Sequence, residues 1–127
     1  MPSRRIVLTL CAALLALPAC GKPPTATVRT APSFDLADLN GGRATLASLK
    51  GKVVVMDFWA TWCGPCLTEL PEYVQFAERN RARGVEVVGV VFDSGEPKEI
   101  QDFVREHRVT YRQLLGSDDM REAFGGN

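Results

Sequence analysis

Two apolar runs rich in β-branched residues constrain most strongly how this chain can fold. Lys52 to Trp59 follows Gly51 and contains four consecutive apolar residues, Val53 to Met56, while Val85 to Phe92 is apolar almost throughout. Such runs are typical of strands buried on both faces, which occur in parallel sheets. The stretch between them is long enough for a helix. Strand, helix and strand in this order predict the βαβ unit of a parallel α/β sheet.

The segment before the first strand predicts a short β-hairpin. Apolar residues at Phe34, Leu36 and Leu39 lead into Asn40-Gly41-Gly42, and Ala44-Thr45-Leu46 follows. Asn-Gly pairs favour the tight turns that join antiparallel strands. We therefore expect a two-stranded hairpin at the start of the domain.

Helical periodicity follows both apolar strands. Leu67, Leu70 and Val74 recur at three- and four-residue steps, and this helix is expected to end at Arg83-Gly84. Pro71 lies inside it and is expected to kink it. The elements predicted after the second strand are a helix that opens within 94–97, a short strand over 111–115 and a helical turn or two over 118–124.

The first twenty residues have the features of an export signal. Arg4 and Arg5 form a positive n-region, and the apolar run Ile6 to Leu17 is too short to span a bilayer stably. Leu17-Pro18-Ala19-Cys20 resembles a bacterial lipobox, in which the cysteine becomes the lipidated first residue. We expect a signal with lipobox over 1–20, the alternative being an ordinary signal. A Pro-containing linker is expected over 21–32 and the domain over 33–127.

Composition excludes several classes of protein. The 127 residues are 46% hydrophobic and 24% charged, which fits one domain with a hydrophobic core. The formal net charge is zero, and no Lys/Arg-rich block is interleaved with aromatic residues. The basic surface of a nucleic-acid-binding protein is therefore not predicted.

The cysteines point to redox chemistry. Of the four, Cys11 lies in the apolar run of the signal and Cys20 in the lipobox, so the domain holds Cys63 and Cys66. Two cysteines are too few for a structural zinc site, which takes four ligands, and the single histidine, His107, is distant in the sequence. We predict no metal site.

The place of Cys63, between a strand and a helix, favours a reactive thiolate. Backbone N–H groups and the dipole at a helix N-terminus lower the pKa of a cysteine from about 8.5 to between about 3.5 and 7.5. We expect Cys63 to be the nucleophile, and Cys66, one turn further on and less exposed, to be the resolving thiol. Pro65 suits the first turn because it needs no N–H there, and Gly64 permits a close approach.

The segment Met56 to Cys66, MDFWATWCGPC, closely resembles the active-site segment of the thioredoxin superfamily. The leading hairpin, Gly51-Lys52 and Glu69-Leu70-Pro71 are similar to the TlpA/ResA-like branch. The resemblance runs from about Ser33 to the end of the chain. It implies a thioredoxin-like α/β fold and a thiol-disulfide oxidoreductase with no cofactor besides the redox-active Cys63–Cys66 disulfide.

The resemblance also implies supporting residues. Thioredoxins carry a buried aspartate six residues before the first cysteine, which relays the proton of the resolving cysteine, and Asp57 stands there. Burial raises the pKa of a carboxyl and makes it a usable proton acceptor, whereas a solvent-facing residue at a strand end is the alternative. Glu69 matches a glutamate of the branch that modulates thiol acidity, or is an exposed helix-surface carboxylate. Trp62 is expected to border the partner groove and Trp59 to pack in the core.

The implied function is disulfide exchange with protein clients, with the Gly-Pro spacer favouring a reductant. Apocytochrome c thiols are the typical clients of this branch, and a membrane electron donor would recharge the protein. We expect it on the periplasmic side of a bacterial membrane, held by a lipid anchor. One alternative is a copper-binding module that uses the cysteines and His107, although such modules space their cysteines by three residues. A thiol peroxidase of related fold is another alternative. Its signature, a Pro and a Thr just before a single reactive cysteine, is absent from this sequence.

A last expectation concerns the C-terminal part of the domain. Thioredoxin-like domains continue with a cis-Pro loop that faces the cysteines, two further strands and a closing helix, but no proline follows Pro97. We therefore expect those strands and the helix to be missing, which leaves an inactive fragment as another alternative. The strand Lys52 to Trp59 would then lie at an open edge with one face poorly covered.

Overall fold

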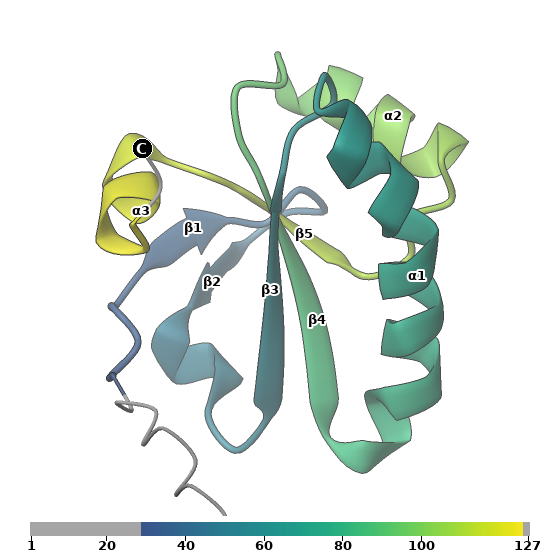
Figure 1. Cartoon of the computed structure of the whole chain (residues 1–127). Coiled ribbons are helices and arrows are strands. Elements are labelled where there is room, and N and C mark those ends of the chain that lie inside the picture. Colours follow the sequence, from purple (N-terminus) through teal and green to yellow (C-terminus); the bar gives the residue numbers. More distant parts are fainter. Residues whose placement is uncertain (1–28, 126–127) are drawn as a thin grey trace, which may run out of the picture.

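A three-stranded parallel sheet organises the computed structural model, which describes residues 29–125. The predicted signal, the lipobox with Cys20 and most of the linker lie outside the described residues. The elements in chain order (Figure 1) are β1 (Asp35–Ala37), β2 (Arg43–Thr45), the 3-10 helix η1 (Leu46–Leu49), β3 (Val53–Trp59), α1 (Gly64–Asn80), the 3-10 helix η2 (Arg81–Arg83), β4 (Val85–Val91), α2 (Pro97–Glu106), β5 (Arg112–Leu115) and α3 (Asp118–Ala123). This order confirms the predicted hairpin and βαβ unit.

The sheet has the strand order β3-β4-β5, and both pairings are parallel. Strands β1 and β2 form a separate antiparallel hairpin. Its turn contains Gly41 and Gly42, whose φ angles of 101° and 83° suit glycine. The hairpin is attached to β5, since the backbone N–H of Leu39 donates to the carbonyl of Gln113 at 2.9 Å. The hairpin therefore lies beside β5, at the end of the sheet opposite β3.

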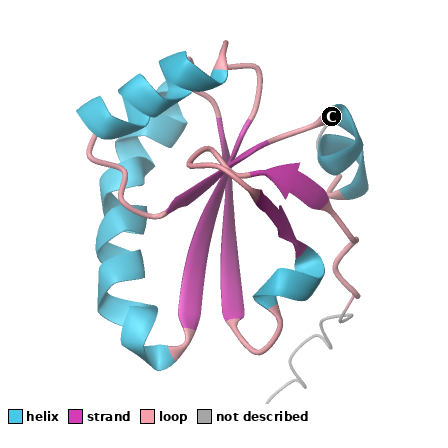
Figure 2. Ribbon diagram, turned by 180° about the vertical axis from the view of Figure 1, so that it is seen from behind, coloured by secondary structure: helices cyan, strands magenta, loops and turns pink. Residues whose placement is uncertain are grey.

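Each face of the sheet is covered by different elements (Figure 2). Helices α1 and α2 cover one face, and the hairpin and α3 lie on the other. Because side chains alternate along a strand, Val87 and Val91 of β4 face the helices while Val88 and Val90 face the hairpin. All four are buried, so β4 is the strand with both faces covered.

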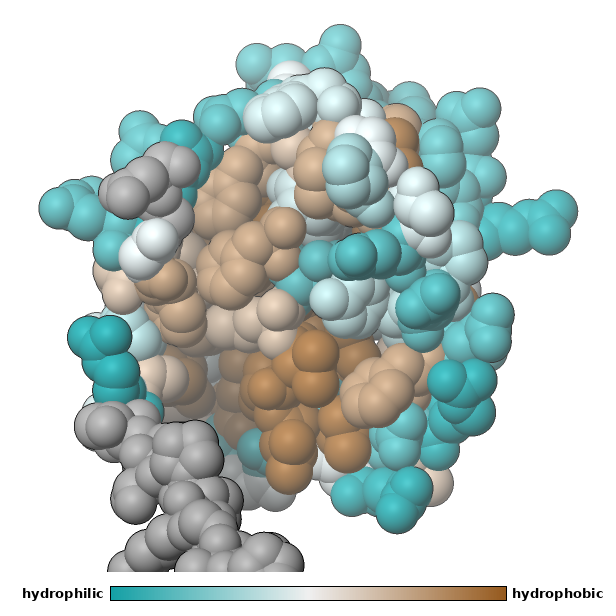
Figure 3. Space-filling view, viewed as in Figure 1, coloured by the Kyte–Doolittle hydropathy of each residue, from teal (hydrophilic) through white to brown (hydrophobic). Residues whose placement is uncertain are grey.

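Strand β3 is less buried than its composition predicts. Val53 is 65% exposed and Phe58 is 40% exposed, and the residues between Val53 and Asp57 are only partly buried. The prediction that Lys52 to Trp59 is buried on both faces is therefore wrong. Among residues 29–125, β3 pairs only with β4 and forms one edge of the sheet, as expected. Figure 3 shows an apolar area over β3 on this side of the molecule.

Helix α1 begins directly after Cys63 and is followed at once by the 3-10 helix η2. Gly84 follows with a φ of 79°, the left-handed conformation that commonly terminates a helix. Pro71 lies within a continuous α1, and the kink predicted there stays a prediction. No helix in the described part of the chain combines the length and the apolar composition needed to cross a bilayer.

A glycine in the middle of β4 makes room for a buried polar side chain. In the register of the sheet, Gly89 lies between Asp57 of β3 and Gln113 of β5. A Cβ atom added at Gly89 would lie 2.1 Å from Oε1 of Gln113. That oxygen accepts a hydrogen bond of 2.9 Å from Nε1 of Trp59, and Nε2 of Gln113 donates to the carbonyl of Tyr111 at 3.1 Å. The close approach explains a glycine inside an otherwise valine-rich strand.

We predict that Gly89→Ala lowers the free energy of unfolding by about 1 to 3 kcal/mol, because the added methyl group displaces a hydrogen-bonded, buried amide. Urea denaturation measures this change. Gly64→Ala is the control, since no atom outside its chain neighbours and the nearby backbone of its own helix lies within 4 Å of the position its Cβ would take. A Gly89→Ala variant as stable as the original chain would show that Gln113 can move without loss.

Candidate active site

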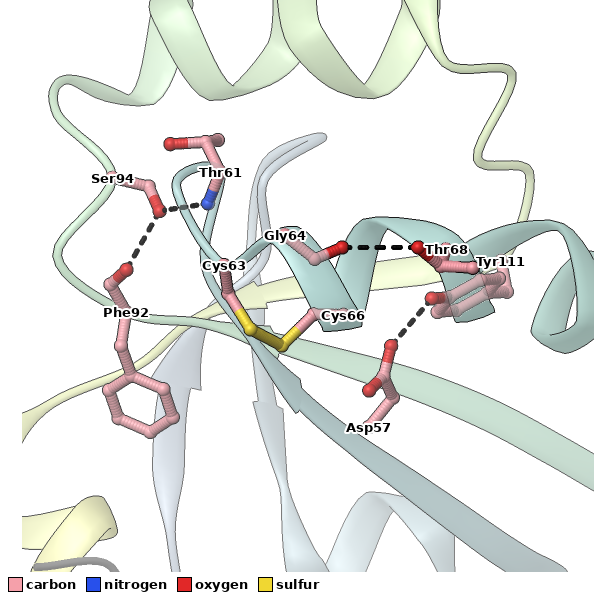
Figure 4. The surroundings of a disulfide bond; sticks show 9 residues. All are labelled: Asp57, Thr61, Cys63, Gly64, Cys66, Thr68, Phe92, Ser94 and Tyr111. Carbon is pink, nitrogen blue, oxygen red and sulfur yellow. Dashed lines mark hydrogen bonds between the residues drawn. A yellow bond between two sulfur atoms is a disulfide. The ribbon is translucent and has the colours of Figure 1, made fainter.

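Cys63 and Cys66 form a disulfide at the start of α1, with their Cα atoms 5.3 Å apart (Figure 4). Cys63 is the N-cap residue of the helix and has an extended backbone, with φ −83° and ψ 93°. Cys66 lies in the first turn, which brings the two sulfurs together. Both cysteines are partly buried in this disulfide form, so the prediction that Cys66 is the less exposed one stays a prediction.

The helix terminus gives Cys63 a positive electrostatic environment. The Cys63 side chain makes no capping hydrogen bond, and the first turn contains no acidic residue. Pro65 occupies this turn, as predicted, where its missing N–H costs no hydrogen bond. The positive end of the helix dipole and the first-turn N–H groups therefore act on the Cys63 sulfur, and they favour its thiolate once the disulfide is reduced.

The loop before Cys63 is fastened to the end of β4. The backbone N–H of Thr61 donates to Oγ of Ser94 at 2.9 Å, and that hydroxyl donates to the carbonyl of Phe92 at 2.7 Å (Figure 4). Nε1 of Trp62 donates to the carbonyl of Asp93 at 2.9 Å. Two hydrogen bonds, to Ser94 and Asp93, thus hold the segment that presents the disulfide, and a third fixes the Ser94 hydroxyl.

An apolar pocket of about 480 Å³ adjoins the disulfide. Its walls are largely aromatic, and Arg121 and Asp93, which form an ion pair at 2.6 Å, also line it. The apolar and sulfur-bearing residues that line it are Phe58, Trp59, Ala60, Trp62, Cys63, Cys66, Phe92 and Phe124. Trp62 is 70% exposed and borders this pocket, and its expected place beside a partner groove stays a prediction. Trp59 is buried in the core, as predicted.

Sequence reasoning missed several pocket residues. Phe58, Phe92 and Phe124 come from β3, from the segment after β4 and from the end of α3. Parallel strands end at the same edge of a sheet, so the residues at the ends of β3 and β4 were candidates for a common site. Phe124 and Arg121 belong to no recognisable motif.

Asp57 is buried on the helix-covered face of the sheet, so the alternative of a solvent-facing residue is wrong. Its Oδ2 accepts a hydrogen bond of 2.8 Å from the hydroxyl of Tyr111. Burial raises the pKa of Asp57, the hydrogen bond from Tyr111 opposes that rise, and the negative charge of Glu69 adds to it. Tyr111 was not predicted, because its contact with Asp57 depends on which strands are neighbours.

The remaining candidates occupy the helix surfaces. Glu69 is exposed on α1, close enough for its charge to act on Asp57. His107 caps the end of α2, where its ring stacks on Phe103 at 3.9 Å and its Nδ1 lies 3.0 Å from the Phe103 carbonyl. Between residues 29 and 125, no three side chains of the kinds that bind metals come together.

Comparison with known proteins gives a family. The family model described as the AhpC/TSA family matches residues 28–126. A curated relative, thiol-disulfide oxidoreductase ResA of Bacillus subtilis (strain 168), is 37% identical over 99 residues, which are 77% of this chain and 54% of that protein. The chain thus spans about half the length of the curated relatives it matches.

Solved structures share the fold. The thioredoxin domain of a thiol-disulfide oxidoreductase from Bacteroides vulgatus has a TM-score of 0.70 at 27% identity and covers 76% of this chain and 71% of that one. A thiol:disulfide interchange protein of the thioredoxin family from Chlorobium tepidum has a TM-score of 0.68 at 31% identity, with coverages of 80% and 70%. With its parallel sheet, its helices and a disulfide at the start of α1, the chain belongs to the AhpC/TSA family and has a thioredoxin-like fold.

Proposed function

We propose that this chain is a thiol-disulfide oxidoreductase that exchanges the Cys63–Cys66 disulfide with protein clients. The observation that carries the proposal is the position of this disulfide, at the N-terminus of α1 and in the wall of an apolar pocket. The names of the relatives support the same chemistry.

The exchange needs two substitutions at sulfur. The thiolate of reduced Cys63 attacks one sulfur of a client disulfide, and the client's other sulfur leaves as a thiolate. The Cys66 thiolate then attacks Sγ of Cys63, which releases the client's first sulfur and forms the Cys63–Cys66 disulfide. Two electrons pass to the client. The sulfurs themselves carry these electrons, so the reaction requires no cofactor.

Asp57 serves the second substitution in this proposal. Cys66 must lose its proton before it can attack, and it lies in the first turn of α1, above the face of β3 that carries Asp57 (Figure 4). A buried carboxylate with a raised pKa accepts a proton more readily than an exposed one. Gly64 and Pro65 shape the turn, Trp62 contacts the client, and Glu69 adjusts the charge near Asp57.

The sequence supports a direction of electron transfer and a cellular location for the protein. The Gly-Pro spacer favours a reductant with a potential near that of thioredoxin, about −270 mV, over a strong oxidant near about −120 mV. We infer that it reduces protein disulfides, such as one formed by the cysteines of apocytochrome c, and is recharged by a membrane electron donor. The predicted signal and Cys20 support a location outside the cytoplasm and a lipid anchor in a membrane.

The first test separates the roles of the two thiols. Cys66→Ser is expected to accumulate mixed disulfides with clients through Cys63, because the resolving attack is lost. Cys63→Ser is expected to accumulate none. Non-reducing gels of alkylated samples measure the adducts, with the double serine variant as the control. Equal accumulation in both single variants would reverse or remove the assignment.

The second test concerns Asp57. Asp57→Asn keeps the shape of the side chain and its acceptor for Tyr111 but removes the titrating carboxyl. We expect the exchange rate at neutral pH to fall by about tenfold or more, and the pH profile of the rate to lose one ionisation. Stopped-flow measurement from pH 5 to pH 9 gives both quantities. An unchanged profile would restrict Asp57 to a structural role.

The same variant has a stability readout that does not depend on activity. Since burial raises the pKa of Asp57, the folded chain keeps this proton at pH values where the unfolded chain has lost it. The stabilisation that the Asp57 carboxyl contributes is present at low pH, and it is lost as the pH rises through the pKa of Asp57 in the folded chain. Asp57→Asn is therefore expected to unfold at higher urea than the original chain at neutral pH, with a difference that disappears on acidification.

The third test concerns the membrane anchor. Cys20→Ser is expected to abolish lipidation and to release the protein from the membrane fraction, because the lipobox cysteine is the acylated residue. Cell fractionation and labelling with a palmitate analogue measure the two effects, with Cys11→Ser as the matched control. A Cys20→Ser protein that still sediments with membranes would indicate an uncleaved signal instead.

A further inference from the structure

A buried hydrogen-bonded chain runs across the helix-covered face of the sheet. In the parallel register Asp57, Gly89 and Gln113 form one row across β3, β4 and β5. Gly89 contributes no side chain, so the groups on either side of it share the space above β4. Tyr111, directly before β5, extends its hydroxyl over this row to Asp57.

Tyr111 makes the one hydrogen bond that Asp57 receives on its carboxylate from the side chains and backbone of residues 29–125. The donor and the acceptor are both buried, at 5% and 7% exposure. A hydrogen bond to a charged acceptor in such surroundings is stronger than one at the surface. Burial and the nearby charge of Asp57 raise the pKa of Tyr111 far above its usual value, so it stays a donor throughout the working pH range.

The tyrosine is itself held in place. Its ring lies 6.3 Å from that of Tyr73 in α1. Its backbone carbonyl accepts from Nε2 of Gln113, whose Oε1 accepts from Nε1 of Trp59. The chain of contacts therefore begins at Asp57 and ends at Trp59, two residues further along β3. It fixes the Tyr111 hydroxyl relative to the Asp57 carboxylate.

We propose that Tyr111 is a positioning residue for disulfide exchange, which holds the Asp57 carboxylate in one orientation and stabilises its charged form. This inference rests on the proposed function. With Oδ2 bonded to Tyr111, Asp57 Oδ1 is left to take the proton of Cys66 when Cys66 attacks Cys63. The proton moves from Sγ to the carboxylate, and no other bond of Asp57 changes.

The groups that face Asp57 come from two elements besides its own strand. Tyr111 lies in the segment directly before β5, and Glu69 and Tyr73 belong to α1. The first turn of α1 also carries Cys66, which forms the disulfide with Cys63. Glu69 disfavours the charged form of Asp57, whereas the Tyr111 hydroxyl favours it. Removal of that hydroxyl is therefore expected to move the titration of Asp57 to higher pH.

Tyr111→Phe tests the proposal, since it removes one oxygen and keeps the ring. We expect the ionisation assigned to Asp57 in the rate profile to shift to higher pH, and exchange at neutral pH to slow by about tenfold. In an Asp57→Asn background the same change is expected to have no further effect on the profile. Tyr73→Phe is the matched control, because it keeps the ring beside Tyr111 and removes a hydroxyl that makes no hydrogen bond to Asp57 within residues 29–125. It is expected to leave the profile unshifted.

A second measurement does not depend on activity. The chain contains two tyrosines, so 3-fluorotyrosine incorporated into the Tyr73→Phe protein labels Tyr111 alone. The fluorinated hydroxyl is the more acidic donor, and the Asp57 carboxyl carbon, followed by ¹³C NMR, is expected to titrate at lower pH than in the unlabelled protein. In Tyr111→Phe it is expected to titrate at higher pH.

The outcomes separate the two proposals. An active chain whose rate profile and Asp57 titration are unchanged by Tyr111→Phe, or equally shifted by Tyr73→Phe, would overturn the positioning role alone. A chain whose reduced Cys63 exchanges with no protein disulfide would overturn the proposed function, and the positioning role with it.

Discussion

Parallel pairing of β3 with β4 positions the central groups of the candidate active site. The ladder runs in register from Val53 opposite Val85 to Trp59 opposite Val91. It brings the carboxyl ends of both strands to one edge, where the loop to Cys63 meets the loop after β4. The same register sets Asp57 beside Gly89. The disulfide, the buried carboxylate and the part of the pocket wall that comes from β3 and the segment after β4 thus depend on a single pairing of two strands.

Burial gives Asp57 a chemistry that its residue type alone does not. A carboxylate removed from water holds its proton more tightly, and a single neutral donor, Tyr111, offsets part of that effect. The neighbouring α1 carries Glu69 on its exposed side, and its charge acts in the same direction as burial. The protonation of Asp57 is therefore set jointly by the sheet, the helix above it and the segment that leads into β5.

Features that depend on local sequence were predictable from the chain. The order of strands and helices follows from β-branched runs and from helical spacing, and the cysteine pair follows from a contiguous segment. Burial of β3 was overestimated because both β3 and β4 are mostly apolar, and composition does not reveal which strand lies at an edge. The hydrogen bond between Tyr111 and Asp57 joins residues 54 positions apart and requires the strand order. Gly89 was the available signal, since a glycine within an apolar strand often marks the close approach of another group.

The hydrogen bond from Trp62 to the Asp93 carbonyl bears on the entropy of client binding. An aromatic side chain that is 70% exposed would ordinarily sample several rotamers, and a partner that packs on it would have to order it. Immobilising such a side chain costs about 0.5 to 1.5 kcal/mol. Here the indole is held at its nitrogen while most of its surface stays open to solvent. Under the proposed function, Trp62 offers a client an apolar surface that is already ordered when the chain has folded.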